Sequence, residues 1–312
     1  MKFKAFLTDN GITLLEKRFL PALDKMGRIC HLYLTKDHAF LLHNLLNGDG
    51  VQSIAQFRKE ALFEDYRISS QNEDRIAFTI DLALLLRALR SSVSINSANN
   101  RLQLKLVKKL TLNSKQPMPF LTFESKGYKS AVIQDVPISK PLSRAHVLEL
   151  QSAIDTAKVL PQTLVQGADF QLQSFVDRLK HVADLLNITI NQYGDLHLQL
   201  CNTLVTLGVE FRKLPVVGVQ KPVPVGDQSM SAQSRTRYAL EKGEAQSVQV
   251  SMKHFAKSLQ CYLAKPDCAF YGITPLGSSL TVIFQFFIPG TRQLDTSISL
   301  HCRLPVLDPG SA

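Results

Sequence analysis

The pattern of apolar and polar positions divides the chain into two stretches that repeat the same order of elements. Each stretch begins with a helical pattern, continues with short alternating strands, and then has a second short helix followed by more strands. The predicted helix starts pair as Asn10 with Asp169, and as Asp81 with Ser251. The members of each pair lie about 160 to 170 residues apart. The pattern therefore predicts a repeat of architecture, without a readable repeat of sequence.

Four helices are predicted from apolar residues at helical spacing behind a residue that can cap the first turn. They cover Ile12–Met26, Leu82–Arg90, Phe170–Leu186 and Met252–Leu263. Phe170–Leu186 has the clearest apolar stripe of the four. Pro21 lies inside the first helix, and we expect it to kink or restart that helix because proline lacks an amide donor.

Alternating or β-branched runs between turn residues predict the strands. They are Lys2–Leu7, Ile29–Thr35, His38–His43, Val51–Arg58, Phe63–Ser69, Arg75–Ile80, Arg101–Val107, Phe120–Glu124, Lys129–Val136, Lys158–Gln166, Asn187–Gln192, Leu196–Cys201, Thr203–Phe211, Ser247–Val250, Cys268–Thr274, Leu280–Ile288 and Leu294–Leu304. Four helices among so many strands favour an α+β chain with helices on one side of long antiparallel sheets.

The prolines suggest where the domains end. Pro137 and Pro141 predict a connector that leaves a strand, so the first domain covers 1–137, the connector 138–152 and the second domain 153–290. Within the second domain, 213–246 combines three prolines with weak periodicity and is predicted to be a long mobile loop. Residues 291–312 form a C-terminal extension to which the sequence assigns no role.

The composition of the chain narrows the class of protein only slightly. The chain of 312 residues is 45% hydrophobic and carries a net charge of +10, which is compatible with a polyanionic partner but is also a simple solubility feature. Five scattered cysteines and an N-terminus without the apolar core of a secretion signal favour reduced, buried thiols in a protein that is not secreted. No apolar run approaches the length of a membrane-spanning helix.

The motifs that carry common catalytic chemistry are missing from the sequence. It contains no phosphate-binding loop, no G-x-S-x-G or H-E-x-x-H motif, and no histidines or cysteines at metal-ligand spacing. We therefore expect no enzyme activity, no cofactor and no metal. A metal-dependent nuclease that uses unrecognised carboxylates stays open as an alternative.

The second helix of each half carries paired positive charges without an acid nearby. Arg87 and Arg90 lie three residues apart, and Lys253 and Lys257 lie four apart. Like charges at these spacings repel each other slightly. A single basic pair is usually a solvated face, but its recurrence in both halves favours a shared contact with phosphate groups.

Four stretches carry a resemblance to a known family. They are the opening MKFKAFLTDNG, DLALLLRALRS at 81–91, DVPI at 135–138 and TVIFQFFIP at 281–289. In this order and spacing they resemble the hydroxyurea-sensitivity subunit of the heterotrimeric DNA-damage checkpoint clamp, over about residues 1–289. That family is similar in fold to the proliferating cell nuclear antigen, in which each subunit has two domains joined by a connecting loop. Three subunits close a ring around duplex DNA.

The resemblance implies roles for individual residues. The inner helices would face DNA through Lys17, Arg18, Lys25, Arg87, Arg90, Arg178, Lys180, Lys253 and Lys257. The strands that pair with neighbouring subunits would carry Lys129, Val132, Val136, Leu204, Leu207 and Phe211. The connecting loop would present Leu142, Val147 and Leu148 to docking partners, unless it is only a passive link.

The function implied by the resemblance is that of a non-catalytic ring subunit in the nucleus. It would assemble with two other checkpoint-clamp subunits, encircle duplex DNA at damage sites without reading its sequence, and present a platform for signalling and repair enzymes. An ATP-driven clamp loader would have to act in trans. A self-assembling replicative clamp is the nearest alternative.

Overall fold

The computed structural model describes residues 1–46, 50–94, 101–110, 116–126, 131–167, 169–201, 206–218 and 231–307. Within these ranges the strands form three sheets in which all pairings are antiparallel. No helix in the described part is long and apolar enough to cross a membrane.

The largest sheet has nine strands and runs through both halves of the molecule. Its order is β14 (Val216–Gly218), β10 (Thr163–Gln166), β16 (Cys268–Ile273), β17 (Ser279–Gln285), β18 (Ile298–Pro305), β4 (Gln52–Arg58), β3 (His38–His43), β2 (Ile29–Leu34) and β6 (Ile76–Asp81). The pairing of β18 with β4 joins the halves, from Ile298 opposite Phe57 to Arg303 opposite Gln52.

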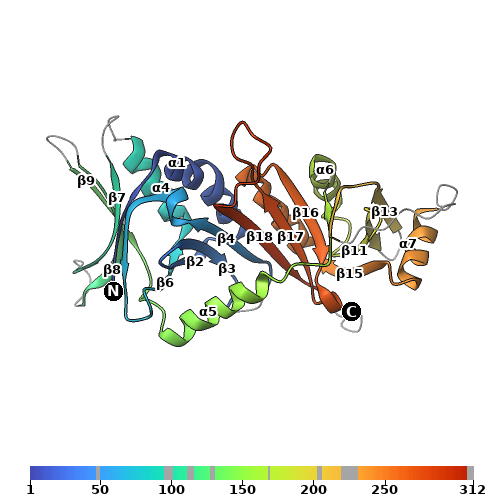
Figure 1. Ribbon diagram of the computed structural model, residues 1–312, viewed down its shortest axis with the longest axis horizontal. Coiled ribbons are helices and arrows are strands. Elements are labelled where there is room, and N and C mark those ends of the chain that lie inside the picture. The colour runs from blue at the N-terminus through green and yellow to red at the C-terminus, as the bar shows by residue number, and fades with distance from the viewer. Residues whose placement is uncertain are drawn as a thin grey trace.

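A smaller sheet lies at each end of the molecule (Figure 1). The first half contributes β5 (Phe63–Ser69), β1 (Lys2–Leu7), β7 (Leu102–Lys109), β8 (Met118–Lys126) and β9 (Ala131–Pro137). The second half contributes β13 (Thr206–Phe211), β12 (Leu196–Cys201), β11 (Leu185–Asn191) and β15 (Ala245–Ser251). Strands β9 and β13 therefore form free sheet edges at opposite ends of the molecule.

The helices follow the four predicted patterns and add three more. They are α1 (Asp9–Thr13), the π-helical turn η1 (Leu14–Phe19), α2 (Leu20–Met26), α3 (Lys59–Leu62), α4 (Leu82–Ser94), α5 (Arg144–Ala157), α6 (Asp169–Leu179), α7 (Ala232–Glu241), α8 (Met252–Ser258) and the 3-10 turns η3 (Leu259–Ala264) and η4 (Pro275–Gly277). In Figure 1 helices α1, α4 and α6 lie along the upper side of the molecule and α5 along the lower side.

The predicted caps are confirmed for α4 and α8 and shifted for the first helix. The Leu84 amide donates to the Asp81 carboxylate at 3.1 Å, and the Ser251 hydroxyl accepts from the His254 amide. In the first helix Thr8, rather than Asn10, caps the start by accepting from the Gly11 amide at 2.9 Å. Asp169 is the first helical residue of α6 and does not precede it.

Pro21 restarts the first helix, as expected. A π-helical turn over Leu14–Phe19 precedes it, and Pro21 lies in the first turn of α2, where its missing amide is tolerated. The Leu20 amide reaches back to the Leu15 carbonyl across this turn. The third helix, by contrast, is shorter than predicted, because Leu185 already belongs to β11.

The prediction that 213–246 is one long mobile loop is wrong for its described parts. Strand β14 pairs with β10, and α7 begins at a Ser231 cap whose hydroxyl accepts from the Ser234 amide. Helix α7 lacks an apolar stripe because it buries a charged side chain, Arg235, together with Ala239. Residues 219–230 of the predicted loop lie outside the described residues.

The C-terminal segment is an integral part of the fold and not an extension beyond it. The predicted strand Leu294–Leu304 is confirmed in part as β18, which lies in the middle of the nine-stranded sheet. Its alternating residues Ile298, Leu300, Cys302 and Leu304 are all buried in the main core. Residues 308–312 lie outside the described residues.

The predicted connecting loop is mostly a helix. Ser143 caps α5 by accepting from the His146 amide, and the helix continues to Ala157, well beyond the predicted loop end. Val147, Leu150 and Ile154 are buried against the outer face of β2, β3, β4 and β6 in a separate hydrophobic cluster. The prolines ended a strand as predicted, but the apolar spacing behind them belongs to an amphipathic helix.

Candidate functional site

The four predicted helices form one continuous layer against the sheets. Helix α2 packs against α4 on one side and against η3 on the other, and α8 continues the layer to α6. Their apolar faces belong to the main core, which includes Leu85, Leu23, Phe255 and Leu172. The polar faces of helices from both halves therefore line the same side of the molecule.

Most of the predicted DNA-facing residues lie on the solvent side of this layer. Lys17, Lys25, Arg87, Arg90 and Lys253 are exposed, and Lys257 is half-buried. Their neighbours on the core side of the same helices are buried, so the helical repeat fixes which way these cations point. The result is a row of positive charges along one side of the chain.

Two of the cations already have acidic neighbours within the layer. Arg90 lies 3.7 Å from Glu16, and Lys180 lies 3.0 Å from Asp177. Exposed ion pairs of this kind contribute about 0–1 kcal/mol, so a phosphate group can displace them at small cost. Both side chains thus stay compatible with the predicted role.

The structure assigns Arg18 a different role from the predicted one. Its Nε donates to the Ala264 carbonyl and its Nη2 to the Lys265 carbonyl, both at 2.8 Å. The guanidinium also lies over the Phe286 ring, 5.1 Å from its centre. Burial lowers the Arg18 pKa from its ordinary value, against the field of Asp267 and Asp295. Arg18 therefore joins the first-half helix to the end of the second-half helix, because η3 leaves carbonyls without helical partners there.

The two predicted interface strands are indeed edge strands, but their side chains divide between core and surface. Val136 and Phe211 are buried in the main core, and Phe211 also lines the groove between α6 and β13. Val132 is half-buried and Leu207 is 39% exposed. An edge strand still offers its unpaired backbone groups to another chain. Lys129 and Leu204 lie outside the described residues.

The predicted docking residues of the connector are mostly covered. Val147 is 2% exposed, and half-buried Leu142 packs against the same cluster beneath α5. Leu148 is 49% exposed on the other face of the helix. The prediction for Val147 is wrong because residues 147 and 148 point to opposite sides of a helix that was taken for a loop.

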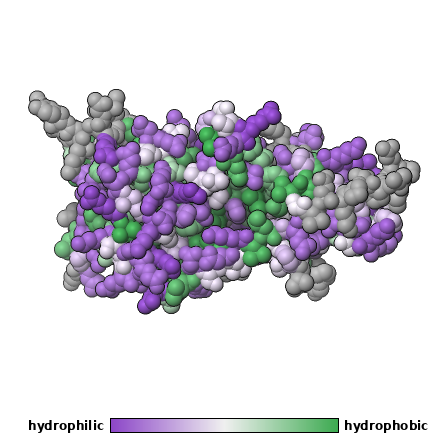
Figure 2. Space-filling view, in the orientation of Figure 1, coloured by the Kyte–Doolittle hydropathy of each residue, from purple (hydrophilic) through white to green (hydrophobic). Residues whose placement is uncertain are grey.

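The sequence did not reveal a second apolar surface next to the connector. Val159 and Leu160, directly after α5, are 56% and 52% exposed. Figure 2 shows a hydrophobic band across the middle of this face, where the segment after α5 crosses to the second half in Figure 1. The adjacent apolar pair before Pro161 was the available signal, but it was interpreted as part of a strand.

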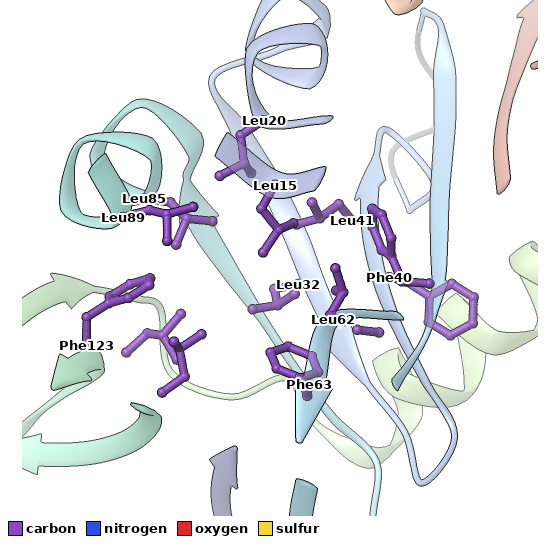
Figure 3. A pocket seen from close by; sticks show the side chains of 14 residues that line it. Leu15, Leu20, Leu32, Phe40, Leu41, Leu62, Phe63, Leu85, Leu89 and Phe123 are labelled. Carbon is purple, nitrogen blue, oxygen red and sulfur yellow. The ribbon is translucent and has the colours of Figure 1, made fainter. Parts of the chain in front are cut away.

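The enclosed apolar cavity of the first half offers no chemistry. It has a volume of about 40 Å³, and Figure 3 shows Leu15, Leu85, Leu89 and Phe123 converging on it from helices and strands. A cavity of this kind stays dry because its apolar lining offers no hydrogen-bond partner to a water molecule. Within the described ranges, no three His, Cys, Asp or Glu side chains gather as metal ligands would.

The three sheets and the helical layer form the fold of the sliding clamps. The chain superimposes on the proliferating cellular nuclear antigen from Entamoeba histolytica with a TM-score of 0.60, over 98% of this chain and 99% of that chain. The sequence identity is 7%, so this likeness establishes the fold alone. The predicted α+β clamp fold is thereby confirmed.

The family follows from the sequence comparisons. A family model described as Hus1-like protein matches residues 1–292, and the chain belongs to this family. It is 25% identical over 271 residues to the Dictyostelium discoideum protein called checkpoint protein hus1 homolog, covering 86% of this chain and 88% of that one. It is 25% identical over 225 residues to checkpoint protein HUS1 of Homo sapiens, covering 69% and 74%. The resemblance found in the sequence is confirmed.

Proposed function

We propose that this chain is a non-catalytic subunit of a heterotrimeric checkpoint clamp that encircles duplex DNA at damage sites in the nucleus. The observation that carries the proposal is the continuous layer of helices, with exposed cations from both halves on one side and a free strand edge at each end. A ring of such subunits holds DNA by closure, so phosphate contacts without base reading are sufficient. The names of the relatives support the checkpoint role.

The DNA-facing residues of this proposal are the exposed or half-exposed cations of the layer that have no structural role. They are Lys17, Lys25, Arg87, Arg90, Arg178, Lys180, Lys253 and Lys257. Arg18 is excluded because its guanidinium bonds the Ala264 and Lys265 carbonyls. Contacts of this type neutralise phosphates and release counterions, which makes association strongly salt-dependent.

The partners of this proposal are two other clamp subunits, an ATP-driven loader, and signalling and repair enzymes. The neighbouring subunits would pair with the edges of β9 and β13, as strands add to an open sheet. The enzymes would dock beside the connector, where Leu148, Val159 and Leu160 provide exposed apolar contacts. This placement replaces Val147, which is buried, and half-buried Leu142.

The test of the DNA-facing layer is a matched pair of quadruple variants in the assembled ring. One variant replaces with alanine the inner-helix cations Arg87, Arg90, Lys253 and Lys257. The other variant replaces with alanine four cations that are exposed outside the helical layer, namely Lys108, Lys140, Arg144 and Lys242. Both variants lose the same charge. We expect the slope of log K against log salt for duplex DNA to fall by about 0.9 for each lost phosphate contact, in the first variant only.

Two outcomes would contradict the proposal. Equal slopes for the two quadruple variants would remove the helical layer from the DNA contact. A stable homotrimer of the isolated chain, measured by native mass spectrometry, would favour the self-assembling replicative clamp instead. We expect a monomer alone and one copy of each subunit in the assembled ring.

A further inference from the structure

Three positive charges lie together on the outer face of the five-stranded sheet of the first half, on the side away from the helical layer. Alternation along β1 buries Phe3 and Ala5 in the main core and turns Lys2 and Lys4 to solvent. Arg67 of β5 is exposed beside them and lies directly opposite Lys4. Lys2, Lys4 and Arg67 together form the outer cation cluster.

Two pairings in this sheet place like charges directly across from each other. Lys4 lies opposite Arg67 of β5 on one side and opposite Lys105 of β7 on the other. Opposite side chains in an antiparallel pair have Cβ atoms about 4.5–5.5 Å apart, and like charges in these positions are destabilising. The row of cations across the three strands therefore costs stability in the isolated chain, and an anionic partner would relieve that cost.

The acids that these five strands carry are all paired with other cations. The pairs are Lys105 with Glu124, Lys109 with Asp135, and Arg101 with both Glu64 and Asp65. Among the residues that the structure describes, no ion pair involves a member of the outer cation cluster. The cluster is therefore surplus charge that its own face of the sheet does not neutralise.

The spacing of the cluster matches that of an extended acidic peptide. Lys2 and Lys4 lie two residues apart on one face of β1, which corresponds to a separation of about 6.8 Å along the strand. Carboxylates on alternate residues of an extended peptide repeat at the same distance. Arg67, beside Lys4, adds a planar guanidinium that binds a carboxylate through two parallel hydrogen bonds.

The surroundings of the cluster disfavour single-stranded nucleic acid as the ligand. Proteins that bind such strands combine cations with aromatic rings on which the bases stack. The ring that adjoins the cluster, Phe6, is already covered by the Arg101 guanidinium, 4.4 Å from the ring centre, and by Lys4 Nζ at 5.8 Å. Arg101 is held in place by Glu64 and Asp65, at 2.7 Å and 3.1 Å. The face thus offers charge for carboxylates but no open ring for a base.

We propose that the outer cation cluster is the docking site for an acidic segment of a partner protein. The segment lies extended along β1 and places alternate carboxylates on Lys2 and Lys4, with a further carboxylate on Arg67. Because the cluster lies on the opposite side of the sheet from the helices, an occupied site leaves the cations of the helical layer free. The inference goes beyond the proposed function and does not depend on ring assembly.

The test uses the full chain and an oligoglutamate peptide as the probe. A photo-crosslinking residue is placed at Ser69, which is exposed opposite Lys2, and at Ser152, which is exposed on α5 as a control. The site-specific crosslink separates this face from the cations of the helical layer, which also attract the peptide. We expect the peptide to be captured at Ser69 and not at Ser152, and an oligothymidylate of matched charge to compete less well than unlabelled peptide.

A matched pair of double variants identifies the cations that hold the peptide. Lys4→Glu with Arg67→Glu should lower the yield of the Ser69 crosslink by about tenfold or more, because both contacts become repulsive. Lys140→Glu with Arg144→Glu changes the net charge equally at exposed positions outside this sheet and should leave the yield unchanged. Equal losses in the two variants, equal capture at Ser69 and Ser152, or stronger competition by the oligothymidylate would each overturn the inference.

Discussion

The two halves of the chain cover the outer faces of their sheets with helices of opposite character. Helix α5 covers the first half with buried Val147, Leu150 and Ile154 in an apolar cluster. Helix α7 covers the second half with Arg235, which is 6% exposed and paired with the Glu210 carboxylate of β13. The comparison teaches that the same position in a repeated fold is stabilised by apolar burial in one half and by a buried ion pair in the other.

The largest predicted effect separates these two modes of packing. Arg235→Met removes the buried partner of Glu210, which keeps only half-exposed Arg212, and should lower the free energy of unfolding by about 3 kcal/mol. Replacing both residues, as Arg235→Met with Glu210→Leu, should recover most of this loss, because an apolar pair needs no compensation. Ile154→Ala in α5 should cost about 2–5 kcal/mol from the lost apolar contacts.

Urea denaturation of the four proteins checks this prediction. A loss below about 1 kcal/mol for Arg235→Met would mean that the pair is solvated, in the range of surface pairs. Failure of the double variant to recover would show that α7 depends on the charges themselves. The first outcome would remove the contrast between the two outer helices, and the second would contradict the predicted recovery.

The second prediction uses acid to distinguish a buried histidine from a buried ion pair. His43 lies in the first half, 2% exposed, with Nε2 2.8 Å from the Gly27 carbonyl and Nδ1 2.9 Å from the Ser53 hydroxyl. Burial lowers its pKa to about 4. The unfolded chain therefore takes up a proton below about pH 6.5 while the folded chain does not. Stability should fall by about 1.4 kcal/mol per pH unit as the pH drops from 6.5 toward 4.

Glu210 in the second half affects the stability of the fold in a different pH range. Burial raises the pKa of its carboxyl, but the hydrogen bonds and charges of Arg235 and Arg212 outweigh burial and hold the pKa below its usual value. Its stabilising contribution is present above the unfolded pKa and is lost only at more acidic pH. Between pH 6.5 and 4.5, the fall of the unfolding midpoint with decreasing pH should become about half as steep in His43→Gln, because burial also lowers the pKa of His301 in β18 to about 4. An unchanged slope would contradict the assignment to His43.

The sequence predicted the repeated architecture because buried apolar residues recur along the chain with the period of a helix or a strand. The four inner helices, most strands and both free edges were found in this way, as were the exposed cations of α4 and α8. Helix α7 was missed because Arg235 and Glu210 pack by charge, which has no hydrophobic period. Helix α5 was missed although Val147, Leu150 and Ile154 follow a helical spacing behind the Ser143 cap, since the nearby prolines favoured a loop.

The functional surfaces were less predictable, because they depend on contacts between distant segments. The sequence placed Arg18 with the other cations of its helix, yet its partners, Ala264 and Lys265, lie in the other half of the chain. A groove of about 580 Å³ between α6 and β13 likewise arises from the separation of the helix and the strand, which no local pattern encodes. Charge patterning identified the face but not the role of each cation on it.

The smallest predicted effect separates the cation that joins the halves from those that face solvent. Arg18→Ala removes two hydrogen bonds to carbonyls and the contact with Phe286, and should cost about 1.5 kcal/mol because the guanidinium is partly exposed. Arg18→Lys should not restore the loss, since one ammonium cannot reproduce the planar fork. The Arg87 side chain is exposed on α4, so Arg87→Ala should change the free energy of unfolding by less than about 0.5 kcal/mol. In the assembled ring the salt slope for DNA should fall for Arg87→Ala by about 0.9 and stay unchanged for Arg18→Ala. The reverse result would make Arg18 a DNA contact and remove the distinction.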